Sequence, residues 1–204
     1  MSHAFQRRAA PRLVLIATLW LAAAAAIGCG TASAASPMST PPGTQTAKWV
    51  RKRLYFTYLG FTTHYSCEGL SDKVRSVLLQ LGARRQGLNV YPAGCVRNIG
   101  VPEPAPSVAG TVYVLEPTAE AGAKSVRAHW QRVTVRLARS PLGQAGQCEL
   151  LEQVRQRILP MFAVRREHFS SNCVPNQLTL PGASLQVEVL EADRPGSRIA
   201  AAAH

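Results

Sequence analysis

The sequence predicts an α+β fold, a mainly antiparallel sheet with two helices on one face. Segments rich in β-branched and aromatic residues recur along the chain, and two amphipathic runs have apolar residues at helical spacing. The runs "SCEGLSDKVRSVLLQL" (66–81) and "QCELLEQVRQRILPMF" (147–162) also resemble each other, since both begin with Cys-Glu followed by Leu and Val-Arg. The chain is therefore expected to contain two β-α-β-β units, and a pseudo-twofold repeat would explain their likeness.

The first unit spans about residues 48–117. We expect its strand, helix and two further strands at 53–65, 67–81, 88–95 and 110–117. The predicted helix has one apolar stripe, formed by Leu70, Val74, Val77, Leu78 and Leu81. Gly82 can end this helix, because glycine adopts the left-handed conformation that follows many helices.

The second unit spans about residues 125–192, and its strand, helix and two further strands are expected at 126–139, 148–159, 162–169 and 184–192. In the first of these strands Val133 and Val135 alternate with polar residues, which predicts a half-buried strand. Pro160 should end or kink the helix near Leu159, because proline lacks the amide hydrogen that the helix needs.

The N-terminus has the features of a secretory signal. Arg7, Arg8 and Arg12 precede the apolar run "LVLIATLWLAAAAAIG", and small residues follow it. Cleavage after "ASA" would remove residues 1–34 and release the protein into the periplasm or the medium.

A second cleavage site competes with the first. The segment "AIGC", which ends at Cys29, resembles the lipobox of bacterial lipoproteins, although Ala26 stands where Leu is usual. The resemblance implies removal of residues 1–28, lipidation of Cys29 and a membrane tether in the bacterial envelope. We favour the released form and keep the lipid-anchored form as the alternative.

Either cleavage leaves four cysteines for pairing. An even number of cysteines in an oxidising compartment predicts two disulfides, which counting alone could connect in three ways. The two units suggest one of the three, because the spacing from Cys67 to Cys95 is nearly the same as that from Cys148 to Cys173. We therefore predict one disulfide within each unit.

Composition separates a single domain, 48–192, from its flanks. The segment 35–47 is rich in Pro, Ser, Thr and Gly and is expected to be a flexible linker. The segment 193–204 is expected to be a disordered tail.

The mature chain is strongly basic. Once the three arginines of the leader are removed, 20 of the 23 Lys and Arg residues face 11 Asp and Glu residues. In an exported protein, such an excess suggests anionic envelope components as partners, and nucleic acid is not expected there. Arg132 and Arg136 should project from the exposed face of their strand, so they are candidates for binding an anionic surface.

Motifs that indicate catalysis are few. Glu68 and Glu149 could form a paired acid and base if the two helix starts come together, although a Glu in the first turn of a helix usually offsets the helix dipole. No zinc-binding helix, phosphate loop or dinucleotide-binding pattern is present, so we predict neither a metal nor a cofactor.

These observations favour a non-enzymatic envelope protein, a binding or structural module for an anionic surface or for another envelope protein. The alternative is a hydrolase of an envelope polymer that uses Glu68 and Glu149. The sequence leaves the specific partner and the oligomeric state open.

Overall fold

The computed structural model describes residues 43–96, 100–138, 147–174, 176–177, 180 and 182–193. Every described residue belongs to one compact domain, which lies within Ser39–His204. The predicted leader with Cys29, most of the linker and most of the tail lie outside the described residues. Within those ranges, no helix is both long enough and apolar enough to cross a bilayer.

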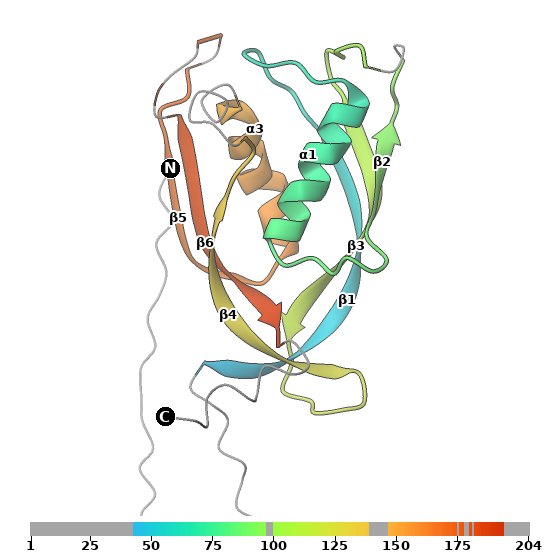
Figure 1. The fold of residues 1–204 in the computed structure, drawn as a ribbon, viewed down its shortest axis with the longest axis vertical. Helices are drawn as coiled ribbons and strands as arrows, with labels where there is room; N and C mark the ends of the chain where they lie inside the picture. Colours follow the sequence, from blue (N-terminus) through green and yellow to red (C-terminus); the bar gives the residue numbers. More distant parts are fainter. Residues whose placement is uncertain are drawn as a thin grey trace, which may run out of the picture. The chain divides into compact units, whose positions relative to one another are not determined.

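One six-stranded antiparallel sheet curves around two helices (Figure 1). The strands are β1 Thr44–Thr57, β2 Asn89–Ala93, β3 Ser107–Pro117, β4 Ser125–Val135, β5 Val164–Ser171 and β6 Ala183–Ala192. The helices are α1 Cys67–Gln80 and α3 Cys148–Gln153, and α3 continues through the π-helical turn η1 Val154–Ile158 and the 3-10 turn η2 Leu159–Met161. The predicted α+β fold is confirmed.

The strand order is β2-β3-β1-β4-β6-β5. Each half of the sheet therefore places its first strand at the centre, its third strand next and its second strand at the edge. The two halves meet where Thr44–Lys48 of β1 pairs with Ser125–His129 of β4. This arrangement follows the β-α-β-β outline expected for each unit.

Strand β1 begins and ends earlier than the sequence suggested. It starts at Thr44, so the last four residues of the predicted linker belong to the sheet, and it ends at Thr57 rather than near Tyr65. The reason is the pairing partner: β3 and β4 supply hydrogen bonds to 44–57, whereas the following segment turns away from the sheet.

Helix α1 has the ends that its sequence predicts. The Ser66 side chain accepts a hydrogen bond from the Gly69 amide at 3.1 Å and caps the first turn. Gly82 follows the helix with a φ of +88°. A side chain there would also approach the Leu190 carbonyl oxygen at 2.9 Å, so glycine is required both by the turn and by the close approach to β6.

The main hydrophobic core lies between the helices and the sheet. Its helical members include Leu70, Val74, Val77, Leu78, Leu150, Leu151, Val154 and Ile158. They pack on residues of both halves of the sheet, including Leu54, Phe56, Val112, Val114, Val135, Leu185, Val187 and Val189. Both helices thus cover the same face, as predicted, and burial of these side chains holds the two units in one domain.

The disulfides have the predicted pairing. Cys67 is linked to Cys95 with a Cα–Cα distance of 6.4 Å, and Cys148 is linked to Cys173 with a Cα–Cα distance of 5.7 Å. Each bond joins the first residue of a helix to the segment that follows the second strand of the same unit.

Removing one disulfide tests the contribution of this framework. Replacing Cys148 and Cys173 together by Ala should lower the free energy of unfolding by about 3 kcal/mol, because the unfolded chain regains the entropy of an open loop. Denaturant unfolding of the oxidised wild type and of the double variant measures the difference. A bond between Cys67 and Cys148 in non-reducing peptide maps of the wild type would contradict the pairing itself.

Candidate functional site

A buried carboxylate on β6 gathers three arginines. The Glu188 side chain is only 7% exposed, on the face of β6 opposite Val187 and Val189. Its Oε2 accepts a hydrogen bond from Arg165 Nε at 2.7 Å. Its Oε1 accepts from Arg166 Nη1 at 2.9 Å and from Arg132 Nη2 at 3.4 Å. We call these four residues the Arg-Glu cluster.

An irregularity in β5 allows two consecutive arginines to reach one carboxylate. Neighbouring residues of a regular strand point to opposite faces of the sheet. The register between β5 and β6 shifts between Arg165 and His168, as in a β-bulge, and Arg166 has a φ of +50°. This left-handed conformation is rare for a residue with a side chain, and strain of this kind is concentrated at functional sites.

The Arg-Glu cluster carries more positive charge than its carboxylate needs. Three guanidinium groups face one carboxylate, and their side chains are 68%, 43% and 67% exposed for Arg132, Arg165 and Arg166. The hydrogen bond from Arg165 is the main cause that lowers the pKa of Glu188, and Arg166 adds to it. Glu188 is therefore ionised at neutral pH, and the cluster keeps a net charge of about +2.

Trp130 contacts the Arg-Glu cluster through Arg165. The guanidinium carbon of Arg165 lies 4.4 Å from the centre of the Trp130 ring, within the range of a cation–π contact. Trp130 packs against a second, smaller hydrophobic cluster, formed by Ala47, Leu115, Ala128 and Leu190. Arg165 is thus fixed by Trp130 on one side and by Glu188 on the other.

The two arginines singled out by sequence have different environments. Arg132 belongs to the Arg-Glu cluster, whereas Arg136 lies just beyond the end of β4. The backbone of Arg136 exchanges two hydrogen bonds with the Gln80 side chain, at 2.8 and 2.9 Å, and its own side chain is exposed. Arg165 and Arg166 were not predicted, because a regular strand would have pointed only one of them toward Glu188.

Glu149, one member of the suggested acid–base pair, holds a loop of the other half of the sheet. Its carboxylate accepts hydrogen bonds from the amides of Phe61 and Thr62, at 2.7 and 3.0 Å, and from the Thr62 hydroxyl at 2.9 Å. The Tyr58 hydroxyl donates a longer one at 3.4 Å. Burial by itself raises the pKa of Glu149, but these hydrogen bonds outweigh it and lower the pKa.

Glu68 likewise has a lowered pKa. Its own amide and the Gly100 amide donate hydrogen bonds that lower its pKa. A glycosidase-type mechanism needs one carboxylic acid with a raised pKa, which neither Glu68 nor Glu149 provides. Both glutamates instead have the structural role of a carboxylate in the first turn of a helix.

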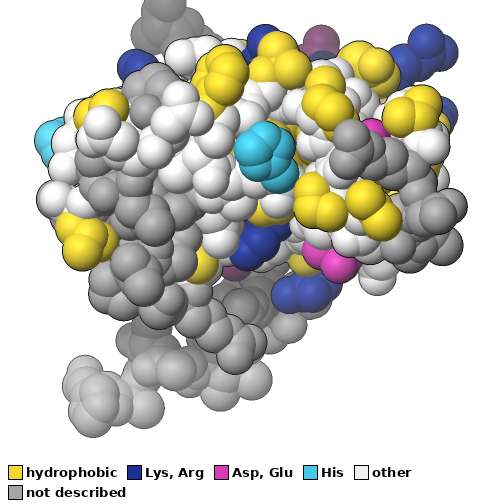
Figure 2. All heavy atoms as spheres, turned by 90° about the horizontal axis from the view of Figure 1, so that it is seen from above, with side chains coloured by type: hydrophobic (Ala, Val, Ile, Leu, Met, Phe, Trp, Pro, Cys, Tyr) yellow, Lys and Arg dark blue, Asp and Glu magenta, His cyan; other side chains and the backbone are white. Residues whose placement is uncertain are grey.

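A third feature is the end of the domain at which both helices begin. Six exposed hydrophobic residues lie in the loops there: Leu59, Phe61, Val96, Val101, Val174 and Leu180. Figure 2 looks onto this end and shows hydrophobic side chains spread over it, with Lys and Arg side chains both at its margin and near its centre. They are dispersed rather than gathered into one groove.

Comparisons with protein-family models, with curated proteins and with solved structures find no match for this chain. In the described part of the chain, no three potential metal ligands of the His, Cys, Asp or Glu type lie close enough together to hold an ion.

The role of Glu149 predicts a pH-dependent stability. Because its pKa is lowered in the folded state, the ionised carboxylate stabilises the fold above its usual pKa of 4.5, and this contribution is lost as the pH falls through the lower folded value. Glu149→Gln should cost about 1 to 2 kcal/mol at pH 7, and less at pH 3. Denaturant unfolding at both pH values measures this, with Glu120→Gln as an exposed control. An equal loss at both pH values would contradict the role.

Proposed function

We propose that this protein is an exported, non-enzymatic envelope protein that binds anionic groups through Arg132, Arg165 and Arg166. The observation that carries the proposal is the convergence of three partly exposed guanidinium groups on one buried carboxylate. The cluster faces away from the helices, so a large ligand or a surface can approach it without a change in the fold.

Neutralisation of Glu188 does not account for the whole cluster. A buried carboxylate requires one paired cation, and here two additional cations are held beside it. Each guanidinium has five N–H donors in a fixed fork, and Glu188 uses only one donor of each arginine. The remaining donors match the oxygen atoms of phosphate and carboxylate groups.

The compartment narrows the range of ligands. The N-terminal sequence predicts export, and two disulfides are compatible with an oxidising compartment. An exported protein would meet anionic lipid headgroups, lipopolysaccharide phosphates and cell-wall carboxylates. A lipid on Cys29, in the alternative processing, would hold the Arg-Glu cluster close to such a surface.

The proposal predicts salt-sensitive binding of the mature chain to phosphatidylglycerol vesicles, with phosphatidylcholine vesicles as the neutral comparison. Raising the salt from 0.1 M to 1 M should weaken binding, since the Debye length falls from about 10 Å to about 3 Å. Arg132→Gln/Arg166→Gln should weaken it about 30-fold at low salt, at about 1 kcal/mol per arginine. Vesicle sedimentation measures both effects, and inorganic phosphate as competitor distinguishes a phosphate site from a lipid surface.

The matched control is Arg136→Gln/Lys124→Gln, which removes the same charge from exposed positions outside the cluster. Its loss of binding should be several-fold smaller. Glu188→Gln gives a second test, because it removes the negative charge of the cluster and should tighten binding while making the protein less stable. Equal losses in the two double variants, or weaker binding of Glu188→Gln, would overturn the proposal.

A further inference from the structure

The first unit contains a counterpart of the Trp130–Arg165 contact. Arg84 lies over the Trp49 ring, with 6.0 Å between the guanidinium carbon and the ring centre. Trp49 precedes Cys67 by as many positions as Trp130 precedes Cys148, and Arg84 and Arg165 follow these two cysteines at equal spacing. Each tryptophan also pairs across the sheet with a leucine, Leu115 or Leu190.

The two counterparts differ at one decisive position. Arg132 pairs across the sheet with Glu188, whereas the equivalent Arg51 pairs with Tyr113. The first unit therefore has no carboxylate where the second unit holds its arginines together. Arg84 instead donates two hydrogen bonds to the Gln86 side chain, at 3.1 and 3.2 Å.

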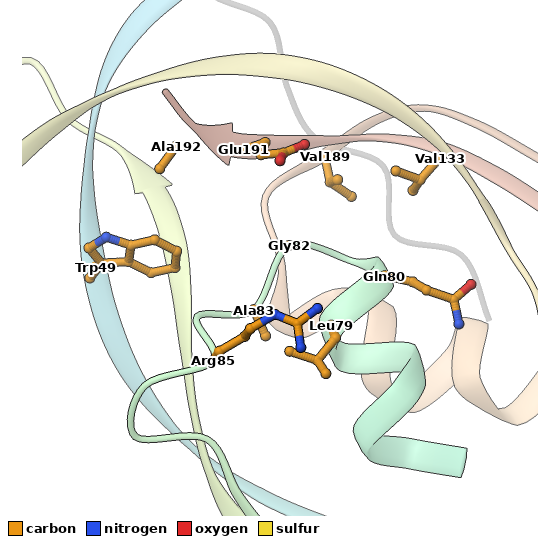
Figure 3. A pocket seen from close by; sticks show the side chains of 10 residues that line it. All are labelled: Trp49, Leu79, Gln80, Gly82, Ala83, Arg85, Val133, Val189, Glu191 and Ala192. Atoms are coloured by element: carbon orange, nitrogen blue, oxygen red, sulfur yellow. The ribbon is translucent and has the colours of Figure 1, made fainter. Parts of the chain in front are cut away.

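A cavity of about 300 Å³ lies beside Trp49, at the C-terminal end of α1 (Figure 3). It is lined by Trp49, Leu79, Gln80, Gly82, Ala83, Arg85, Val133, Val189, Glu191 and Ala192. Figure 3 shows the Trp49 ring extending from β1 on one side of Gly82, the Arg85 side chain beside Leu79, and Glu191 on β6. A volume of this size is at the lower end for ligand sites and suits one ring-sized group.

The polar groups of the cavity define what it can bind. Among the described residues, neither Arg85 nor Glu191 forms an ion pair, although both line the same cavity. The Gln80 amide is already used by the Arg136 backbone. A suitable ligand therefore offers an anionic group to Arg85, hydrogen-bond donors to Glu191 and a flat apolar surface to Trp49.

We propose that this cavity is a subsite for one acidic sugar residue. A pyranose ring packs its C–H face on an aromatic ring, its hydroxyl groups donate to a carboxylate, and its acidic group pairs with a guanidinium. The inference deepens the proposed function, since it rests on binding of an anionic envelope component and makes that component a glycan. The cavity contains none of the residues of the Arg-Glu cluster, so experiments can disprove the sugar subsite and the anion-binding cluster independently.

Saturation-transfer NMR on the mature, oxidised protein tests the subsite with D-glucuronic acid, D-glucose 6-phosphate and D-glucose. The two acidic sugars should bind and D-glucose should bind at least tenfold more weakly, and the comparison of the acids distinguishes a carboxylate from a phosphate ligand. Arg85→Gln should weaken binding of the acids about tenfold, which corresponds to about 1.4 kcal/mol. Trp49→Phe should weaken binding of all three sugars.

Lys124→Gln is the control for loss of one positive charge, and it should leave sugar binding unchanged. Arg85 is exposed, so Arg85→Gln remains informative even if Trp49→Phe unfolds the protein. Absence of acid binding, equal binding of D-glucose, or preferential binding of the zwitterion L-phenylalanine would overturn the subsite. Loss of vesicle binding in Arg132→Gln/Arg166→Gln with sugar binding intact would leave the subsite supported and assign vesicle binding to the Arg-Glu cluster alone.

Discussion

Five residue pairs between β1 and β4 hold the two halves of the sheet together. Thr44–Lys48 and Ser125–His129 form this ladder, and at its centre Thr46 pairs with Arg127. These two residues are separated in sequence by the same number of positions as Cys67 and Cys148. Because β1 and β4 pair side by side, the two halves form one sheet with both helices on the same face, and both helices begin at the same end of that sheet.

Hydrogen bonds between the halves strengthen this short ladder. Glu149, Gln153 and Arg157 follow one another at helical spacing, and all three form hydrogen bonds with the last residue of β1 or with the loop after it, between Thr57 and Thr62. A carboxylate that accepts several hydrogen bonds is stabilised in its ionised form, which suits a structural link and removes the proton that an acid catalyst would need. For Glu149, the hydrogen bonds that lower its pKa are the same ones that link α3 to the loop after β1.

Much of the fold could be predicted from sequence because local patterns and tertiary packing agree. The stripe Leu70, Val74, Val77 and Leu78 predicted α1, and similar Cys spacings predicted the disulfides. The spacing of apolar residues in the second helix does not match that of the first throughout. When the two helical runs are aligned at their cysteines, Val154 comes one position earlier than Val74 does in the first run. The buried residues Leu78 and Leu159 again have the same spacing as Cys67 and Cys148.

The structure explains that discrepancy in part. Helix α3 turns π-helical at Val154–Ile158, and a π-helical turn accommodates one additional residue without changing the helix face that follows. Single-residue irregularities of this kind leave no clear sequence signal. The irregularity in β5 at Arg166 likewise leaves no sequence signal. The alternation of apolar and polar residues correctly predicted that Arg132 faces outward. It could not predict that both Arg165 and Arg166 reach Glu188.

Arginine side chains therefore have different surroundings in the two halves of the sheet. Around Trp130, Glu188 orders three arginines on an open sheet face, which favours contact with an extended anionic surface. Around Trp49, no carboxylate replaces Glu188, and Arg85 is left beside a cavity that admits a single ring. A polymer of acidic sugars could satisfy both environments, because its repeating charge suits the open face and its individual rings suit the cavity. Recognition would then depend on the geometric difference between two halves that share one β-α-β-β plan.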